Sequence, residues 1–333
     1  SDKQEESLRA AIEKPGPIHE ETAKMIELGR ASLKELHRGA ACSRCVWGTP
    51  LEEGAEVLLP HCAKVRQLVR LACARAHLRF QQHRPAEAID DLMAAMTLGR
   101  HLADDRIIIC LMVDFAVERQ AIGAAARHLG QLQAAQLDDF AARLDRLPPA
   151  LTMRQAIQSE KEFLLEGFIR DLSGPNAKEK VAALLKGISD NDAAVSKWLQ
   201  EAPAEQIRDA AIALRPVYDK IAAMMEGPPA EVKSPETLLA GLNGPARALG
   251  MGLLPTVLAC RVSEAAHQTR LAMLKAAVAV ARHGREALRN ESFQDPYGGG
   301  PFAYEKTPGG FRLVSKTRDR DGKAVILEVG QQP

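Results

Sequence analysis

The hydrophobic residues of this chain recur at spacings of three and four positions over most of its length. Between residues 55 and 82 they follow one face of a helix, and Pro85 can open the next helix because the first helical turn needs no N–H donor there. The pattern predicts amphipathic helices packed against one another. Segments with this spacing are 5–14, 18–38, 55–82, 85–100, 104–129, 137–147, 152–170, 177–187, 192–201, 203–225 and 255–289.

The C-terminal segment follows a different pattern. After a glycine-rich turn at 295–300, short stretches at 302–306, 311–316 and 324–329 have the composition of β-strands. Turns are expected at 308–310 and 321–322, where proline and glycine occur. Two or three short strands are not stable alone in water, so we expect this tail to pack onto the helices. The residues expected to make the contact are Phe302, Tyr304, Phe311 and Leu313.

The sequence therefore predicts a mostly α fold. We expect an irregular antiparallel helical bundle or a tetratricopeptide-like helical array, with a small C-terminal β-hairpin or meander. Residues 1–290 form the expected helical domain, with a candidate subdivision near 227–235, and residues 291–333 form the hairpin tail. Segment 71–100, with Ala76, Ala88, Leu92 and Ala95, resembles one tetratricopeptide hairpin. No second copy occurs at that period, which disfavours a true repeat array.

Composition and charge exclude several functional classes. With 46% hydrophobic and 26% charged residues, the chain can bury a substantial core. Its 44 basic and 43 acidic residues nearly cancel, so no global field would attract nucleic acid. The longest apolar run, 107–113, is too short to span a bilayer. No signal peptide opens the chain, but a start at Ser1 is compatible with removal of a targeting segment.

The tail also carries a recognisable set of residues: Asp295, Pro296, Tyr297, Gly298, Pro301, Phe302, Tyr304, Phe311, Arg312, Leu313, Val314, Ser315, Asp321 and Gly322. This segment resembles the C-terminal strand region of type II secretion major pseudopilins. The resemblance implies local strand structure only. The apolar pilin helix and the acidic loop of the pseudopilin calcium site are absent, so neither filament assembly nor calcium binding is expected.

A broader set of residues comprises Trp47 and Gly48, the stretches 58–61, 86–92 and 100–102, and the same tail. Together they resemble an uncharacterised bacterial family of exported, mostly helical proteins, whose members often carry an export segment. The resemblance implies a periplasmic or secreted location and implies no activity.

Cysteine and histidine residues form one candidate metal site. Cys42-x-x-Cys45 followed by His61-Cys62 offers ligands that suit tetrahedral zinc. The spacing is not a standard one, and adjacent residues at a helix start point about 100° apart, which disfavours zinc. If the protein is exported, a disulfide from Cys62 to Cys42 or Cys45 is the alternative; in a reducing compartment, free thiols are expected. The other cysteines, which we expect to be buried as small hydrophobic residues, are Cys73, Cys110 and Cys260.

Two carboxylic acids stand out within an apolar helix. Asp114 interrupts the apolar stretch 107–117, and Glu118 follows one turn later on the same face. Buried carboxyl groups need either an arginine partner or a proton. The expected partners lie on helices with apolar faces of their own: Arg66, Arg70 and Arg261. A buried ion pair that sets helix register is the favoured interpretation, and a catalytic or ligand-binding acid pair is the alternative.

A polar stripe marks the longest expected helix. Arg261, Glu264, His267 and Arg270 recur at three-residue spacing there. Exposed ion pairs of this kind are common, so a solvated ladder is expected.

The motifs of common enzyme classes are missing. No nucleotide-binding loop, G-x-S-x-G elbow or H-E-x-x-H helix occurs, and we expect no cofactor. We interpret the chain as a non-enzymatic, exported helical interaction or scaffold protein, whose partner is another protein met by a concave helical surface or by the hairpin. The alternative is an enzyme or small-ligand binder with an inter-helical pocket containing Asp114 and Glu118.

Overall fold

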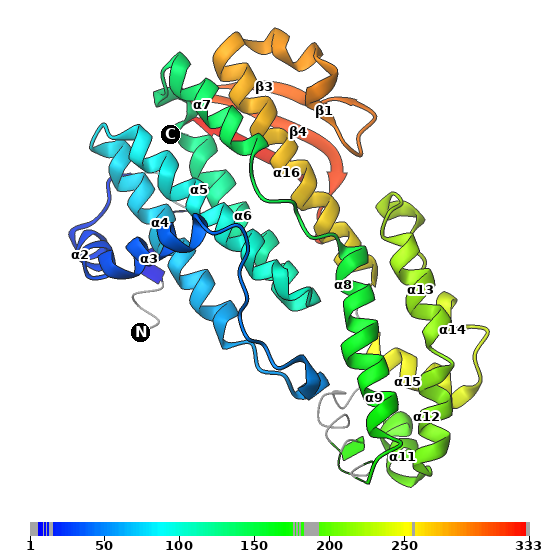
Figure 1. Cartoon of the computed structure of the whole chain (residues 1–333). Coiled ribbons are helices and arrows are strands. Elements are labelled where there is room, and N and C mark those ends of the chain that lie inside the picture. The colour runs from blue at the N-terminus through cyan, green and yellow to red at the C-terminus, as the bar shows by residue number, and fades with distance from the viewer. Residues whose placement is uncertain are drawn as a thin grey trace.

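The computed structural model places most of the chain in α-helices and ends it in a small antiparallel sheet (Figure 1). It describes residues 6–8, 10, 12, 16–175, 177, 179, 181–182, 193–254 and 257–330. The prediction of a mostly α fold with a C-terminal β element is confirmed. The expected helices at 5–14 and 177–187, and the expected starts at 192 and 255, lie partly outside the described residues. Within the described ranges, no helix is long and apolar enough to cross a bilayer.

The first hydrophobic core is enclosed by long helices from the N-terminal half of the chain. They are α2 (Glu20–Leu28), α3 (Arg30–Ala40), α4 (Pro60–Gln81), α5 (Pro85–Leu102), α6 (Ile108–His128) and α7 (Ala134–Asp145). The C-terminal half of α16 (Val257–His283) closes this core, and η1 (Leu51–Glu56) and η3 (Leu129–Gln131) are short 3₁₀ turns beside it. Buried residues surround α6 on most sides, which explains why its sequence is apolar almost throughout.

A second hydrophobic core follows the Pro148-Pro149 segment and lies at the other end of the molecule (Figure 1). Its helices are α8 (Met153–Glu160), α9 (Glu166–Asp171), α11 (Ala193–Glu201), α12 (Ala204–Ile212), α13 (Arg215–Met224), α14 (Pro235–Leu239) and α15 (Gly244–Leu253), with one π-helical turn, η4 (Lys161–Leu165), and one 3₁₀ turn, η5 (Pro229–Glu231). Helix α16 contributes Cys260 to this core and Met273 to the first one. The candidate subdivision near 227–235 lies inside this second cluster, since Val232 and Leu239 both belong to it.

Two helices have ends that differ from those expected. Helix α6 begins at Ile108 rather than near 104, because Arg106 takes a left-handed conformation (φ 56°) after the 3₁₀ turn η2 (Ala103–Asp105). Helix α16 ends at His283 rather than near 289. Gly284 has φ 81°, a conformation that commonly terminates a helix, and the 3₁₀ turns η6 (Arg285–Arg289) and η7 (Glu291–Phe293) follow.

The tail forms a three-stranded antiparallel sheet in the order β3-β4-β5, made of β3 (Ala303–Thr307), β4 (Gly310–Arg318) and β5 (Ala324–Gly330). A two-residue pair, β1 (Gln294–Asp295) with β2 (Gly300–Pro301), precedes it. One face of the sheet packs onto α6 and α16 and joins the first core through Phe302, Phe311, Leu313, Val325, Leu327 and Val329. Tyr304 is half-buried against the same core. The prediction that the tail packs onto the helical body is therefore confirmed.

Candidate functional site

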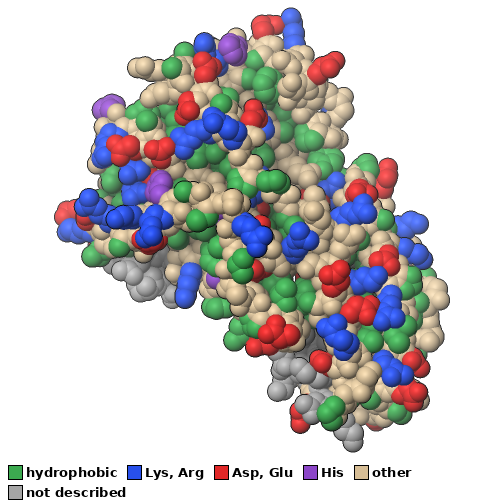
Figure 2. All heavy atoms as spheres, in the orientation of Figure 1, with side chains coloured by type: hydrophobic (Ala, Val, Ile, Leu, Met, Phe, Trp, Pro, Cys, Tyr) green, Lys and Arg blue, Asp and Glu red, His purple; other side chains and the backbone are tan. Residues whose placement is uncertain are grey.

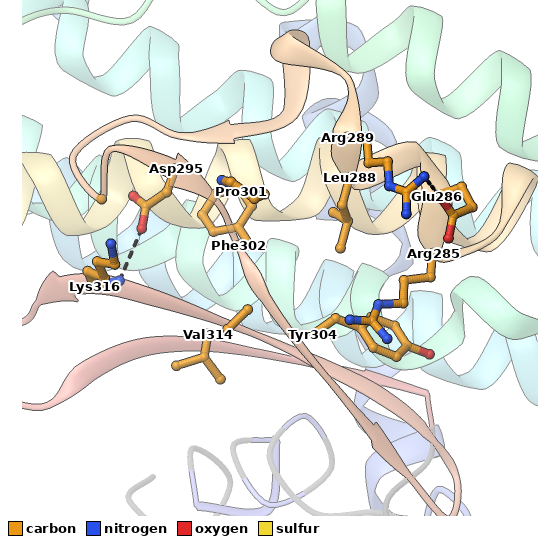
Figure 3. A pocket seen from close by; sticks show the side chains of 12 residues that line it. Arg285, Glu286, Leu288, Arg289, Asp295, Pro301, Phe302, Tyr304, Val314 and Lys316 are labelled. Carbon is orange, nitrogen blue, oxygen red and sulfur yellow. Dashed lines mark hydrogen bonds and ion pairs between the residues drawn. The ribbon is translucent and has the colours of Figure 1, made fainter.

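The C-terminal sheet borders a pocket of about 510 Å³ (Figure 3). Residues of η6 line one side of it, and residues of β1 to β4 line the other. Its lining combines apolar side chains, among them Leu288, Phe302 and Val314, with the cationic side chains of Arg285 and Lys316. A pocket of this composition can hold an apolar group beside an anionic one.

The acidic residues of this pocket already have partners. Glu286 forms an ion pair with Arg289 at 2.8 Å. Asp295 is buried and accepts hydrogen bonds from the Ser315 hydroxyl at 2.6 Å and from the backbone N–H of Lys316 at 3.0 Å (Figure 3).

The two cations at the pocket are not paired in this way. The guanidinium of Arg285 lies over the ring of Tyr304, 5.3 Å from its centroid. Within the described part of the chain, neither Arg285 nor the ammonium group of Lys316 forms an ion pair with an acid. The pocket therefore favours a carboxylate over a cation as its occupant.

Strand β3, beside the pocket, is the edge of the sheet and pairs with β4 on one side. Thr307 and Gly310 flank the two-residue hairpin turn and are register partners. The pair that flanks such a turn is hydrogen-bonded, so the alternating ladder directs the backbone N–H and C=O of Tyr304 and Lys306 away from β4. Backbone groups at such an edge can pair with a further strand.

The face of the sheet away from the helices carries a short apolar row. Ala303, Val314 and Ile326 are successive register partners across the three strands. Ile326 is 42% exposed. The row runs from the edge strand across the sheet beside the pocket, so an extended segment bound along β3 could bury part of it.

The predicted acid pair is buried as expected. Asp114 and Glu118 on α6 are both 0% exposed. Glu118 accepts a hydrogen bond from Nη2 of Arg100 on α5 at 3.3 Å, and Nε2 of His267 on α16 lies 3.3 Å from the same carboxylate. The Glu118 carboxylate thus ties three helices of the first core together.

The arginine beside Glu118 is not one of the three that were expected. Arg66 is exposed, Arg70 lines a different pocket, and Arg261 pairs with Glu264 at 2.8 Å. Arg100 could have been found from the sequence, because it interrupts the apolar stretch around Leu98 and Leu102 as Asp114 interrupts its own stretch.

Asp114 differs from Glu118 because neither of its oxygens has a hydrogen-bond partner. Gly99 makes room for it, since a Cβ at that position would overlap Oδ1 of Asp114. Burial and the nearby Glu118 carboxylate raise the pKa of Asp114 well above its usual value and so favour its protonated form. Burial also lowers the pKa of His267 to about 4, so its imidazole is neutral at neutral pH and lies with Nε2 next to the Glu118 carboxylate.

The polar stripe on α16 is not a solvated ladder, and that expectation was wrong. Arg261, Glu264 and His267 are 3%, 2% and 3% exposed. Glu264 accepts the backbone N–H of Met153, the first residue of α8, at 2.8 Å. The stripe is buried because α6, α8 and the tail cover this face of α16.

All six cysteines are free, which is the arrangement expected for a reducing compartment, and Cys62 has a neighbour that was not expected. Cys42 is exposed, with its Sγ 3.5 Å from a backbone carbonyl, and Cys45 donates its backbone N–H to Asp104. Cys62 instead faces Cys110, with 3.6 Å between the two Sγ atoms. Cys110 is buried as expected, and its thiol also contacts that of Cys62.

His61 joins the two buried cysteines. The ligand atoms of His61, Cys62 and Cys110 lie within 4.8 Å of one another, and this group among the described residues includes neither Cys42 nor Cys45. The hydrogen bond between the two sulfurs lowers the pKa of Cys62 and, together with burial, raises the pKa of Cys110.

Comparison of the chain with protein-family models, with curated proteins and with solved structures found no match. A function can therefore be inferred only from the geometry and charge of the chain itself. Figure 2 shows acidic and basic side chains intermixed over the face in view, with no extended basic surface. This face gives no indication of nucleic-acid binding.

Proposed function

We propose that this protein is a non-enzymatic interaction protein whose C-terminal sheet binds an extended segment of another protein. The observation that carries the proposal is the outward edge of β3, which lies beside a pocket with two unpaired cations. In strand addition, backbone hydrogen bonds supply affinity and the neighbouring pocket selects side chains. Since the other face of the sheet is part of the first core, the helical body would hold the edge rigid for a partner.

The charges at the pocket indicate what the partner segment carries. An acidic side chain would meet Arg285 and Lys316, while an apolar neighbour would contact Leu288 or Val314. We therefore propose a segment in which acidic and apolar residues are mixed. Reversal of the charge at Arg285 should weaken binding more than loss of the nearby Glu286–Arg289 pair, which is already satisfied within the chain.

The proposal includes export to the periplasm or outside the cell. It is supported by the resemblance of the residues around Trp47, His61 and the tail to an exported bacterial family. Reading the full gene for an export signal upstream of Ser1 and fractionating the source cells both test it. Recovery of the native protein from the cytosol alone would contradict this part of the proposal.

A photo-reactive residue placed at Lys316 of the full chain tests the docking surface directly. We expect it to crosslink one protein species in source cells, and the same residue at Leu28, which is 84% exposed on α2, to crosslink none of it. The purified partner should then bind the full chain. Lys306→Pro removes an outward N–H of β3 and Arg285→Glu reverses a pocket charge, so each should weaken binding by about 10-fold or more.

Leu28→Asp is the matched control for these variants, because it changes an exposed residue far from the sheet and should leave the affinity unchanged. Thermal unfolding of all variants checks that the fold is retained. Identical crosslinks from Lys316 and Leu28, or full affinity in both Lys306→Pro and Arg285→Glu, would show that β3 is not the docking edge.

The structure gives less support to an inter-helical site built on Asp114 and Glu118. Both side chains are completely buried, so a ligand could reach them only if α5, α6 and α16 separated. Their arrangement agrees better with a polar network that fixes the register of these helices.

A further inference from the structure

We propose that His61, Cys62 and Cys110, together with Asp105, bind one Zn²⁺ ion. The side chains come from two separate parts of the chain: His61 and Cys62 lie in the first turn of α4, Asp105 ends η2, and Cys110 lies in the first turn of α6. This site is separate from the outward edge of β3, so zinc binding does not depend on the docking function proposed for that edge.

The distances between the ligand atoms match those around a tetrahedral zinc ion. With ordinary zinc–ligand bond lengths, such an ion separates two sulfurs by about 3.8 Å, sulfur and nitrogen by about 3.6 Å, and nitrogen and oxygen by about 3.4 Å. The observed separations are 3.6 Å from Cys62 Sγ to Cys110 Sγ and 3.8 Å from Cys110 Sγ to His61 Nε2. Oδ2 of Asp105 lies 3.3 Å from His61 Nε2, but Asp105 is outside the group of ligand atoms that all lie within 4.8 Å of one another.

Adjacent His61 and Cys62 can serve one ion despite the angle between neighbouring positions on a helix. Their ligand atoms lie within 4.8 Å of each other. Trp47 fixes the ring by stacking on it, with 5.1 Å between centroids and 15° between planes. The indole N–H of Trp47 is itself held by the carbonyl of His101 at 2.8 Å.

Asp105 borders this group and can serve as the fourth ligand only if its carboxylate moves closer to the two sulfurs. Its Oδ2 accepts a hydrogen bond from the Thr49 hydroxyl, the kind of second contact that orients a metal-binding carboxylate. The His61 and Asp105 side chains are 14% and 11% exposed, so an ion can enter from the surface, whereas both thiols are buried. Four protein ligands would make this a closed, structural site that ties the loop before α4 to the start of α6.

A Cys62–Cys110 disulfide is the competing use of the same thiols. Disulfide formation needs the two sulfurs at about 2.05 Å, so they would have to approach each other considerably. It would also leave unexplained why an imidazole nitrogen lies at a zinc-like distance from the pair. On zinc binding, the two thiol protons are released to solvent and both sulfurs bind as thiolates.

The proposal is tested by titrating the reduced, chelator-treated full chain with Zn²⁺ against a chromophoric chelator. We expect one bound zinc per chain, a higher melting temperature, and thiolate-to-metal absorption when Co²⁺ replaces zinc. Cys110→Ser and His61→Ala should lose stoichiometric binding, and Asp105→Asn should weaken it by about 10–100-fold. Circular dichroism of each apo variant shows whether it is folded, and Asp105→Asn, which changes a side chain near the surface, keeps the test open if the buried variants unfold.

The double variant Cys42→Ser with Cys45→Ser is the matched control, because it removes two thiols outside the proposed ligand set and should keep full zinc affinity. Loss of zinc in this double variant would overturn the assignment of ligands. Absence of zinc binding by the folded chain with free thiols would overturn the site itself, as would a native Cys62–Cys110 disulfide found by mass spectrometry in place of the metal.

Discussion

The two hydrophobic cores differ in where they place their polar groups. The first core encloses them within long helices: Asp91 is 0% exposed and accepts hydrogen bonds from Arg75 at 2.9 Å and Arg79 at 2.7 Å. Apart from the ends of α6 and α16, the second core is built from helices of five to ten residues. There the ion pairs between helices lie nearer the solvent, as in the pair of Arg215 with Glu166, whose side chains are 43% and 28% exposed.

Helix length accounts for much of this difference. Helices α4, α5 and α6 run side by side for several turns, so a charged group on one can be matched by several donors on the others. Short helices whose first turns contain proline, such as α13, α14 and α15, have fewer neighbouring turns from which partners could come. We infer that polar networks set helix register in the first core, whereas the second relies more on apolar burial and has fewer buried polar contacts, such as that of Glu264 with Met153.

Removal of one buried charge should expose this contrast most strongly. In the first core, Glu118→Gln leaves Arg100 buried without its carboxylate and should lower the free energy of unfolding by about 3–5 kcal/mol. In the second, Glu166→Gln removes a partly exposed pair with Arg215 and should cost less than about 1 kcal/mol. Urea unfolding curves of both variants give the comparison, and equal losses would mean that the two regions do not differ in this way.

The C-terminal sheet should behave as part of the first core. Leu313 is 0% exposed between the sheet and the helices, so Leu313→Ala should cost about 3 kcal/mol. Val314, the next residue, faces away from the helices and is half-buried, so Val314→Ala should cost less than about 1 kcal/mol. Chemical unfolding combined with hydrogen exchange of α6 and α16 checks this. A sheet that melts in Leu313→Ala without loosening those helices would be a separate unit.

The elements that could be predicted from the sequence are those set by local pattern. The helical spacing, the strands after residue 300, and the burial of Asp114 all follow from which positions are apolar. Helix ends were less accurate, because the left-handed residue Arg106 has no distinctive sequence mark.

Partners that are distant in sequence could not be predicted by the same means. Periodicity shows that a residue lies on a buried face but not which helix covers it, so Arg100 was missed as the partner of Glu118 and Cys110 as the partner of Cys62. The stripe containing Glu264 was placed in solvent for the same reason, because nothing in α16 itself shows that α8 and the tail cover it.

Acid should loosen the first core because it contains two neutral histidines in series. His77 Nδ1 and His128 Nε2 are 2.7 Å apart, and His77 Nε2 donates to the carbonyl of Gly16 at 2.9 Å. Because His77 donates from Nε2, its Nδ1 must accept the proton carried by His128 Nε2, and no second proton fits between these two nitrogens. Burial lowers the pKa of His128 to about 3, from 6.5 for the unfolded side chain.

Because the folded pKa is depressed, this contribution to stability is complete above pH 6.5 and is lost as pH falls. One differential proton corresponds to about 1.4 kcal/mol per pH unit, so the loss between pH 6.5 and 5 should be about 2 kcal/mol. His128→Gln should flatten the profile, as measured by hydrogen exchange of α4 and α6. If the stability of the parent protein did not change between pH 6.5 and 5, His77 and His128 would not both be neutral in the folded state.

The second core should respond to pH with the opposite sign. The Glu160 carboxylate accepts the N–H of Ile108 at 3.2 Å, and burial raises its pKa to about 7 from 4.5. Its contribution is complete below pH 4.5 and is lost as pH rises towards 7, so exchange in α8 and α13 should speed up over that range. Glu160→Gln should remove this trend. If hydrogen exchange in the two cores changed in the same direction with pH, either the lowered pKa of His128 or the raised pKa of Glu160 would be wrong.

The smallest expected effect on stability is that of Asp114→Asn, and Asp91→Asn is its comparison. Asp91 and Asp114 both belong to the first core and are equally buried, but their hydrogen-bond partners differ. Asp91→Asn deprives Arg75 and Arg79 of a carboxylate and should cost about 3 kcal/mol. Asp114 has no hydrogen-bond partner among the described residues, and burial raises its pKa, so at low pH Asp114→Asn replaces one neutral group by another of similar shape and should change stability by less than about 1 kcal/mol. Since the pKa of Asp114 is raised on folding, its contribution is complete below pH 3.8 and is lost as pH rises, whereas asparagine does not titrate. The free energy of unfolding of Asp114→Asn should therefore rise relative to that of the parent as pH increases, which urea titrations at several pH values would show.

A stability loss as large as that of Asp91→Asn would mean that Asp114 is ionised and paired. A stable Asp114→Asn variant that fails to bind a captured small molecule would favour a ligand site over a structural network.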